Sequence, residues 1–378
     1  MLDVVRTIHP IGQGGFVSEY LPGLKPYSDH LVVYDCGTST KLDKKYVYSI
    51  FDSLPKRDID ILFISHFDKD HVSLIPELKK WVESGGAKID KVVIPLTSKN
   101  ERMQLSQLSG DKALQSMILS PEKFFEDSVV VKVEPFTGHE EASEPIQEEE
   151  LVRPKISSGT CIVGNDWEYI PFNFKRQTRR KQFLKACRSE KIDTRKLRNT
   201  EYVLSHITEL QNVYKSSLIE GTINQNSMLL YSGSRNANVL SRIAWSDCRK
   251  CLRSWCGMCA NGTRIDIRKG SCLYTGDCDW STARFFFNHL KDRAAKIGAF
   301  QIPHHGSKGS YDNKARAFLN SLNADCFVQF GMENGYGHPS MDILFSGNPT
   351  RLLFLVTERG GAISPYRRCP PVSGLCYR

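Results

Sequence analysis

Short apolar runs that each end in polar residues constrain the fold of this chain more than any other feature of its sequence. Residues 59–65 (IDILFIS) lead directly into His66, and residues 299–303 (AFQIP) lead into His304. Runs of this length between turn signals are typical of buried strands. Similar runs occupy residues 31–35, 91–95, 227–231, 271–275, 324–330 and 351–357. Helical stretches are predicted over 72–84, 279–297 and 312–323, and strands alternating with helices indicate an α/β fold.

Composition places the chain among soluble globular proteins. It has 378 residues, of which 25% are charged and 40% hydrophobic, which is ordinary for a protein with its own core. No stretch approaches the roughly 18 apolar residues of a membrane span, and the first residues lack the apolar centre of a signal peptide. We therefore expect a cytoplasmic protein that does not contact a membrane. We predict one domain over residues 1–378, with insertions at about 100–220 and about 234–268.

Histidines and aspartates gather where the predicted strands end. Within His66-Phe67-Asp68-Lys69-Asp70-His71, two imidazoles and two carboxylates follow one buried strand. Burying these groups without a partner would be costly, and a divalent cation removes that cost. Imidazole and carboxylate together suit Zn, Mn or Fe. Further clusters hold Asp277, the pair His304 and His305, and His338, and ligands of open α/β sheets gather beyond the strand ends.

These clusters, taken in order, resemble a known family. SHFDKDH is similar to the HxHxDH signature of the metallo-β-lactamase fold. The whole set looks like the nuclease domain of the ComEC DNA-uptake family and its soluble relatives, over about residues 5–100 and 222–365. The resemblance implies an αββα sandwich, in which two mixed β-sheets are covered by helices and a metal site lies at one edge. The other motifs that carry it are IGQGG (11–15), NQNS (224–227), TGD (275–277), PHHGS (303–307), YGHP (336–339) and T-x3-G (357–361).

The resemblance also implies roles for individual residues. His66 and Asp68 would hold one metal, and Asp70 and His71 would hold a second. Asp277 would bridge the two metals. Either His304 or His305 would complete the second site, and the choice stays open. The catalytic set would be Asp70, Asp277 and His338, with His338 facing the leaving or developing anionic oxygen of the substrate. Asp35 would not bind a metal itself but would orient one of the metal ligands.

The chain departs from the family pattern at two points. Asp68 stands where the signature has its second histidine, and this hard oxygen donor favours Mn or a mixed site over Zn alone. The family often supplies one more histidine from the middle of the sequence, and only His139 has a similar local motif. An exposed loop histidine is the better interpretation of His139. We expect two divalent metals, Zn or Mn, at the active site.

Positive charge is concentrated in one segment. Residues 175–198 contain eleven Lys and Arg against two acids, which matches the net charge of +9 of the whole chain. Such a cluster is the footprint of a polyanion site, and a solvated helix face is the alternative. The residues that we predict to bind nucleic acid are Lys175, Arg176, Arg179, Arg180, Lys181 and Lys185.

Four of the twelve cysteines lie close together, at Cys248, Cys251, Cys256 and Cys259. Two CxxC pairs provide the four thiolates of a tetrahedral structural Zn site. An iron–sulfur cluster and free thiols are the alternatives. We predict one structural Zn in this second insertion.

Two close metals clamp the attacking and leaving oxygens of a displacement reaction, so the sequence predicts a metal-dependent hydrolase. We interpret it as a phosphodiesterase or nuclease acting on DNA, although RNA is not excluded. One alternative is a hydrolase of a small ester, lactone or cyclic nucleotide. Another is a partner-activated effector or accessory subunit of a multiprotein system such as phage defence, with its protein partner docked on an insertion.

Overall fold

The computed structural model describes most of the chain. The described residues are 3–22, 29–97, 102, 111–138, 144–164, 166–174, 184–196, 202, 205–215, 227–235, 240–245, 270–348 and 350–365. The four clustered cysteines, His139 and five of the six predicted nucleic-acid contacts lie outside them.

Within the described residues, the strands form two mixed sheets. The first sheet has the order β12 (Leu240–Trp245), β1 (Asp3–Ile8), β2 (Gly14–Leu21), β3 (His30–Thr38), β4 (Ile59–Phe63), β5 (Ile89–Pro95), β6 (Val129–Val133) and β8 (Lys155–Ile156). The second has the order β17 (Gly360–Pro365), β16 (Leu352–Thr357), β15 (Asp325–Gln329), β14 (Ile297–Gln301), β13 (Ser271–Tyr274), β11 (Met228–Ser234), β10 (Trp167–Asn173), β9 (Ile162–Gly164) and β7 (Ile146–Gln147).

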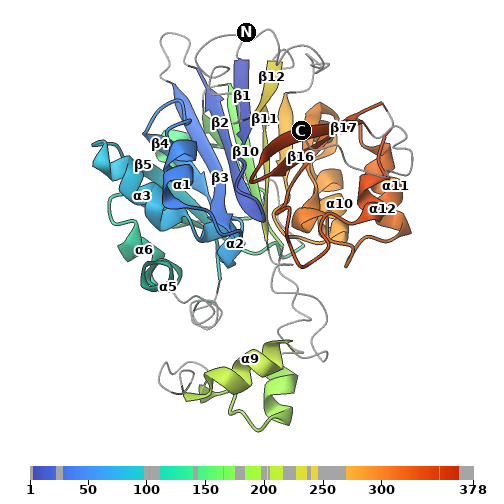
Figure 1. Ribbon diagram of the computed structural model, residues 1–378. Coiled ribbons are helices and arrows are strands. Elements are labelled where there is room, and N and C mark those ends of the chain that lie inside the picture. The colour runs from blue at the N-terminus through green and yellow to red at the C-terminus, as the bar shows by residue number, and fades with distance from the viewer. Residues whose placement is uncertain are drawn as a thin grey trace.

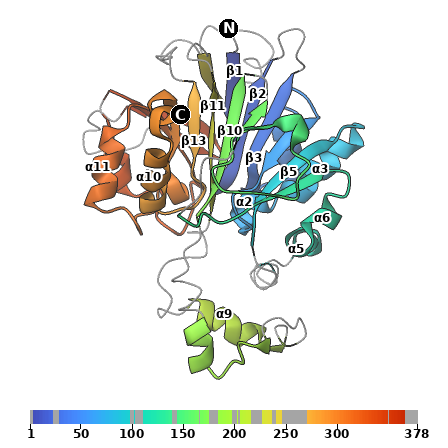
Figure 2. The same cartoon turned by 180° about the vertical axis from the view of Figure 1, so that it is seen from behind.

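Helices cover the outer face of each sheet (Figures 1 and 2). The first sheet carries α1 (Lys44–Phe51), α2 (Lys69–Val72), α3 (Ile75–Ser84), α5 (Lys112–Leu119) and α6 (Pro121–Phe124). The second carries α10 (Trp280–His289), α11 (Asn313–Ser321) and α12 (Met341–Leu344). Short 3-10 turns are η1 (Glu148–Glu150), η4 (Lys291–Lys296) and η5 (Pro303–Gly306). The predicted four-layer αββα sandwich is confirmed.

Three apolar clusters correspond to the three interfaces of these layers. The alternation of side chains along a strand sends one set to each face. Val32 and Phe63 join the cluster between the sheets, whereas Val33 and Leu62 pack beneath α1 and α3. A third cluster holds α10 and α11 against the second sheet. The runs read as strands in the sequence are therefore apolar on both faces, as expected of buried strands.

Two predicted helices are interrupted. The stretch 72–84 contains only the last residue of α2, Val72, and its helix begins at Ile75 as α3, with Pro76 in the first turn. The stretch 279–297 becomes α10 followed by η4, and Lys291 at the break has a φ of 50°.

The range of about 100–220 is not an insertion throughout. Strands β6 and β10 come from it and lie within the two sheets, because their apolar residues fill the inter-sheet core. The part with its own small core comprises residues 184–196 and α9 (Ile207–Lys215), where Cys187 and Leu210 are buried in a separate cluster. Both views show α9 apart from the sheets. Strand β12, within about 234–268, likewise pairs in parallel with β1.

No helix among the residues that the structure describes is both long and apolar enough to cross a bilayer.

A buried ion pair ties the two sheets together. Arg6 of β1 lies 2.6 Å from Glu19 of β2 through Nη2 and Oε1, and both side chains are almost completely buried. The Tyr274 hydroxyl of the second sheet donates to Glu19 Oε1 at 2.6 Å, and Ser232 Oγ donates to Oε2. Removing one partner of such a pair leaves an uncompensated buried charge.

We therefore expect Glu19→Leu to lower the free energy of unfolding by about 3–5 kcal/mol, measured by urea denaturation. The double variant Arg6→Met/Glu19→Leu should recover a large part of that loss, since no charge is then left unpaired. Lys88→Ala removes only a surface ion pair with Asp90 and should leave stability close to that of the wild type. A loss for Glu19→Leu as small as that of the surface control would contradict the role of the pair.

Candidate metal centre

The segment that follows β4 supplies one side of the site. The chain leaves β4 at Phe63 and begins α2 at Lys69. Asp68 occupies the N-cap position of α2 but makes no side-chain capping bond, so its carboxylate is not used to cap the helix. His66 and His71 are buried, and their rings lie 4.2 Å apart. This local structure supports the metal-ligand interpretation over a simple polar helix cap.

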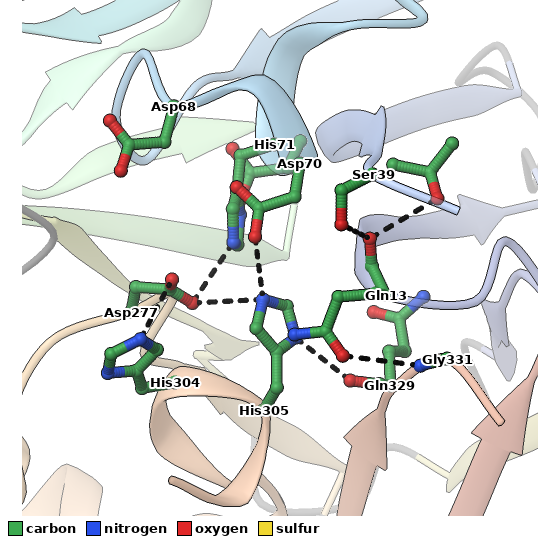
Figure 3. A network of polar contacts seen from close by, with 12 residues as sticks. Gln13, Ser39, Asp68, Asp70, His71, Asp277, His304, His305, Gln329 and Gly331 are labelled. Atoms are coloured by element: carbon green, nitrogen blue, oxygen red, sulfur yellow. Dashed lines mark hydrogen bonds and ion pairs between the residues drawn. The ribbon is translucent and has the colours of Figure 1, made fainter. Parts of the chain in front are cut away.

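Asp277, which follows β13, lies between the imidazoles of His71, His304 and His305 (Figure 3). Its Oδ1 lies 3.0 Å from His71 Nε2 and 3.3 Å from His305 Nε2. Its Oδ2 lies 3.7 Å from His304 Nε2 and 4.0 Å from His66 Nε2. The carboxylate is 1% exposed. The two oxygens of one buried carboxylate therefore face two different pairs of histidines.

A strained turn presents the two adjacent histidines. His304 and His305 have φ values of 49° and 52°, a left-handed conformation that L-residues seldom adopt in succession. The His304 N–H donates to the Gly276 carbonyl at 3.0 Å, and His305 Nδ1 lies 2.9 Å from the Gln329 carbonyl. The second bond fixes Nδ1–H as a donor, so Nε2 of His305 points toward Asp277 and toward Asp70 Oδ2, which is 3.3 Å away.

Buried partners orient the other two imidazoles. Asp35 Oδ2 lies 2.8 Å from His71 Nδ1 and also accepts from Ser65 Oγ at 2.7 Å. Because Ser65 Oγ donates to Asp35, it accepts from His66 Nδ1 at 2.8 Å, and Ser227 Oγ lies 3.1 Å from the same nitrogen. In both histidines the contact at Nδ1 directs Nε2 toward Asp277. Partners of this kind hold metal-ligating histidines in the correct tautomer.

The pKa shifts of the buried histidines are those expected of groups that bind a cation. Burial, with a smaller contribution from His71, lowers the pKa of His66 to about 3, so this ring is neutral at pH 7. Burial also lowers the pKa of His71, but Asp277 and Asp35 outweigh it and raise that pKa well above its ordinary value. The Nε2 atom of His66 is buried without a hydrogen-bond partner, and the carboxylate oxygens of Asp68 and Asp277 lie 4.0 Å from it. Buried polar atoms without partners are rare, and a metal ion at this position would satisfy it.

The donor set fits a divalent metal. Ligand atoms of Asp70, His71, Asp277 and His305 all lie within 4.8 Å of one another. Around Asp277 Oδ2 lie the Nε2 atoms of His304 and His66, and Asp68 Oδ2 is 4.0 Å from His66 Nε2. Imidazole and carboxylate donors are the ligands expected for Zn or Mn.

His338 lies beside these donors without being one of them. Its ring centroid is 5.5 Å from that of His304 and 6.4 Å from that of His305. Burial first, then the neighbouring imidazoles of His304 and His305, lower the pKa of His338 to about 4, so the ring is neutral at pH 7. Its Nδ1 is buried without a hydrogen-bond partner. A neutral imidazole at the edge of the donor set suits a group that contacts substrate.

Residue-level reasoning from the sequence missed three contributors. Ser227 belongs to the NQNS motif and Ser65 begins SHFDKDH, so the sequence marked both positions. It did not predict that their hydroxyl groups contact His66. Gln329 had no such signal, because it lies within the apolar run 324–330. Its carbonyl orients His305, and its Nε2 donates to the carbonyls of His9 and Phe16 at 2.9 and 3.0 Å.

Comparison with known proteins gives limited similarity. No family model matches the chain. It is 36% identical over 76 residues to cleavage and polyadenylation specificity factor subunit 3 of Dictyostelium discoideum, a stretch that covers 20% of this chain and 10% of that protein. The chain therefore matches only a tenth of the length of this relative. No comparison tests the predicted ComEC branch, which stays a prediction.

Among solved structures, the chain is similar to the metallo-β-lactamase MIM-1 of Novosphingobium pentaromativorans. The alignment has 12% identity and a TM-score of 0.29, and it covers 88% of this chain and 78% of that one. A TM-score this low carries no argument. The sandwich assignment depends on the two sheets and their helices.

A metal that binds only the native site should stabilise the fold. At a concentration a hundredfold above Kd, the stabilisation is about 2.7 kcal/mol. We expect Mn²⁺ or Zn²⁺ to raise the Tm of the chelator-treated protein, and we expect Asp277→Ala to abolish that rise. The exposed substitution Asp127→Asn should leave it unchanged. Equal metal-induced shifts in the wild type and Asp277→Ala would show that the metal binds elsewhere.

Asp35 should act through His71, because it does not itself face the other donors. We expect Asp35→Asn to weaken metal binding by about 10- to 100-fold while the protein stays folded. Isothermal titration with Mn²⁺ measures the affinity, and circular dichroism checks the fold. An unchanged affinity would remove Asp35 from the set of residues that support the metal.

Proposed function

We propose that this protein is a metal-dependent phosphodiesterase that cuts nucleic acid, with DNA as the expected substrate. The observation that carries the proposal is the placement of Asp277, whose two oxygens face separate sets of ligand atoms. A carboxylate placed in this way would be able to hold two metals. Two metals supply Lewis acidity and a nucleophilic water at neutral pH.

The geometry suggests how the ligands divide. Asp70, His71 and His305 would hold one metal together with Asp277 Oδ1. The second metal would be held by Asp277 Oδ2 with another set, consisting of His66, Asp68 and His304. Sequence reasoning expected only one histidine of the adjacent pair to bind metal, whereas here His304 and His305 lie on opposite oxygens of Asp277.

Other residues of the chain would prepare the substrate. His338, neutral at pH 7, would donate a hydrogen bond to the oxygen on which negative charge develops. Asp35, Ser65 and Gln329 would keep the histidine rings in place through contacts at the opposite ring nitrogens.

Two observations favour nucleic acid over a small ester. The relative from Dictyostelium discoideum is named for cleavage and polyadenylation, which favours a nucleic-acid substrate for the shared segment. The positive excess of residues 175–198 supplies phosphate-binding charge. Lys185 and Arg188 lie in the described part of that segment, and both are exposed.

The purified protein with Mn²⁺ should degrade labelled DNA, and Asp277→Asn should reduce the rate by at least about a hundredfold, because several kcal/mol of charge stabilisation are removed. Single- and double-stranded DNA and RNA of the same sequence are assayed in parallel on gels. Asp127→Asn is the matched control and should cleave at the wild-type rate.

If the protein cleaves RNA but not DNA, the substrate is RNA and the proposed metal-dependent hydrolysis is unchanged. If metal-loaded protein cleaves neither polymer, the nuclease proposal fails. The small-substrate and partner-activated hypotheses then take its place.

A further inference from the structure

An exposed aromatic ring stands next to the metal centre. Tyr336 is 70% exposed and belongs to the loop that carries His338. Met341 and Phe345, a few residues further along, are 62% and 56% exposed. Because most of its ring faces solvent, Tyr336 contributes little to the fold through burial.

Hydrogen bonds hold this loop in one conformation. Asn334 Oδ1 accepts from the backbone N–H groups of Tyr336 and His338, at 3.2 and 3.0 Å. Asn334 Nδ2 donates to the carbonyls of Gly331 and His338, at 2.6 and 2.7 Å. One amide side chain therefore closes the loop on itself. A loop whose backbone is already ordered loses little conformational entropy when a ligand binds.

The loop is also joined to the turn that carries the adjacent histidines. The Ser340 N–H donates to the Gly306 carbonyl at 2.8 Å. A side chain at Gly306, which has a φ of 79°, would lie 2.5 Å from Pro339 Cβ, so the two segments are in direct contact. The position of Tyr336 is thus set relative to His304 and His305.

Three rings form a series from the surface into the site. The centroid of Tyr336 lies 5.6 Å from that of His338, with an angle of 29° between the ring planes. His338 lies 6.4 Å from His305 at 23°. Tyr336 is the outermost ring, and His305 belongs to the metal-ligand cluster. A flat group placed on Tyr336 would therefore lie beside a phosphate held at His338 and the metals.

We propose that Tyr336 is a stacking platform for an unpaired nucleobase next to the scissile phosphate. This inference rests on the proposed function and adds to it a preference for single-stranded substrate. Stacking on an aromatic side chain requires a base that is free of its duplex neighbours, and it tolerates every base because each has a π face.

The test compares Tyr336→Ala, Tyr336→Phe and Phe345→Ala on single-stranded DNA. The alanine variant at 336 should raise KM by roughly 5- to 150-fold, which is the range for loss of one stacked base, with little change in kcat. Tyr336→Phe keeps the ring and should behave as wild type. Phe345→Ala removes another exposed ring that is not in the series and should have little effect.

A second arm measures binding without cleavage. Oligonucleotides that carry 2-aminopurine at each position in turn are bound in the presence of a chelator. Wild type and Tyr336→Phe should quench the fluorescence at one position, and Tyr336→Ala should not. An oligonucleotide that is abasic at that position should remove the difference in KM between wild type and Tyr336→Ala.

The outcomes separate this inference from the proposed function. If the wild type cleaves DNA and Tyr336→Ala has the same KM and the same quenching, the platform is overturned and the nuclease stands. If the wild type cleaves nothing but quenches only when residue 336 is aromatic, the platform stands and the nuclease fails. Absence of ring-dependent quenching in a wild type that cleaves nothing overturns both.

Discussion

The carboxylate of Asp277 is the group on which the rest of the site depends. A buried carboxylate costs several kcal/mol unless other charges compensate it. Burial would raise the pKa of Asp277, but His305 and His71 hold it well below its ordinary value. A cation and protons therefore compete for the same imidazole nitrogens, and metal binding would replace the protons that now balance this charge. The imidazoles come from both sheets, since His71 follows β4 and His305 follows β14.

Backbone strain is concentrated at this site. Asp35, His304 and His305 all have positive φ values, between 49° and 55°, and each such residue costs on the order of 1–3 kcal/mol. The strain persists because neighbouring segments pack closely. A side chain at Gly15 would lie 2.8 Å from His71 Nδ1, and one at Gly37 would lie 2.2 Å from the Val72 backbone. Two strands thus approach α2 at positions that only glycine permits, and this contact fixes His71 against Asp35.

The sequence was informative wherever function depends on a strand end. Asp277 and His304 follow the neighbouring parallel strands β13 and β14, whose carboxyl ends lie at one edge of the sheet, so their proximity could be predicted. Contacts that form only when the sheets pack could not be predicted from local pattern. Ser227 reaches His66 from the opposite sheet, and Gln329 orients His305 through a backbone carbonyl, which any residue type would supply. Strand β10 was missed for a related reason, because it lies among irregular stretches and only its place in the inter-sheet core defines it.

The metal ligands depend on one part of the structure, and the residues that we expect to contact substrate depend on another. The metal ligands need both sheets, which are joined beside the site where the Met228 N–H donates to the Ser65 carbonyl at 2.7 Å and Tyr34 Oη donates to the Met228 carbonyl at 2.9 Å. A substitution in the inter-sheet core should therefore weaken fold and metal site together. Tyr336 and the residues around α9 lie instead in a closed loop and in a small cluster of their own. Loops on a rigid scaffold tolerate change, so the sequence can vary there while the geometry around Asp277 is kept.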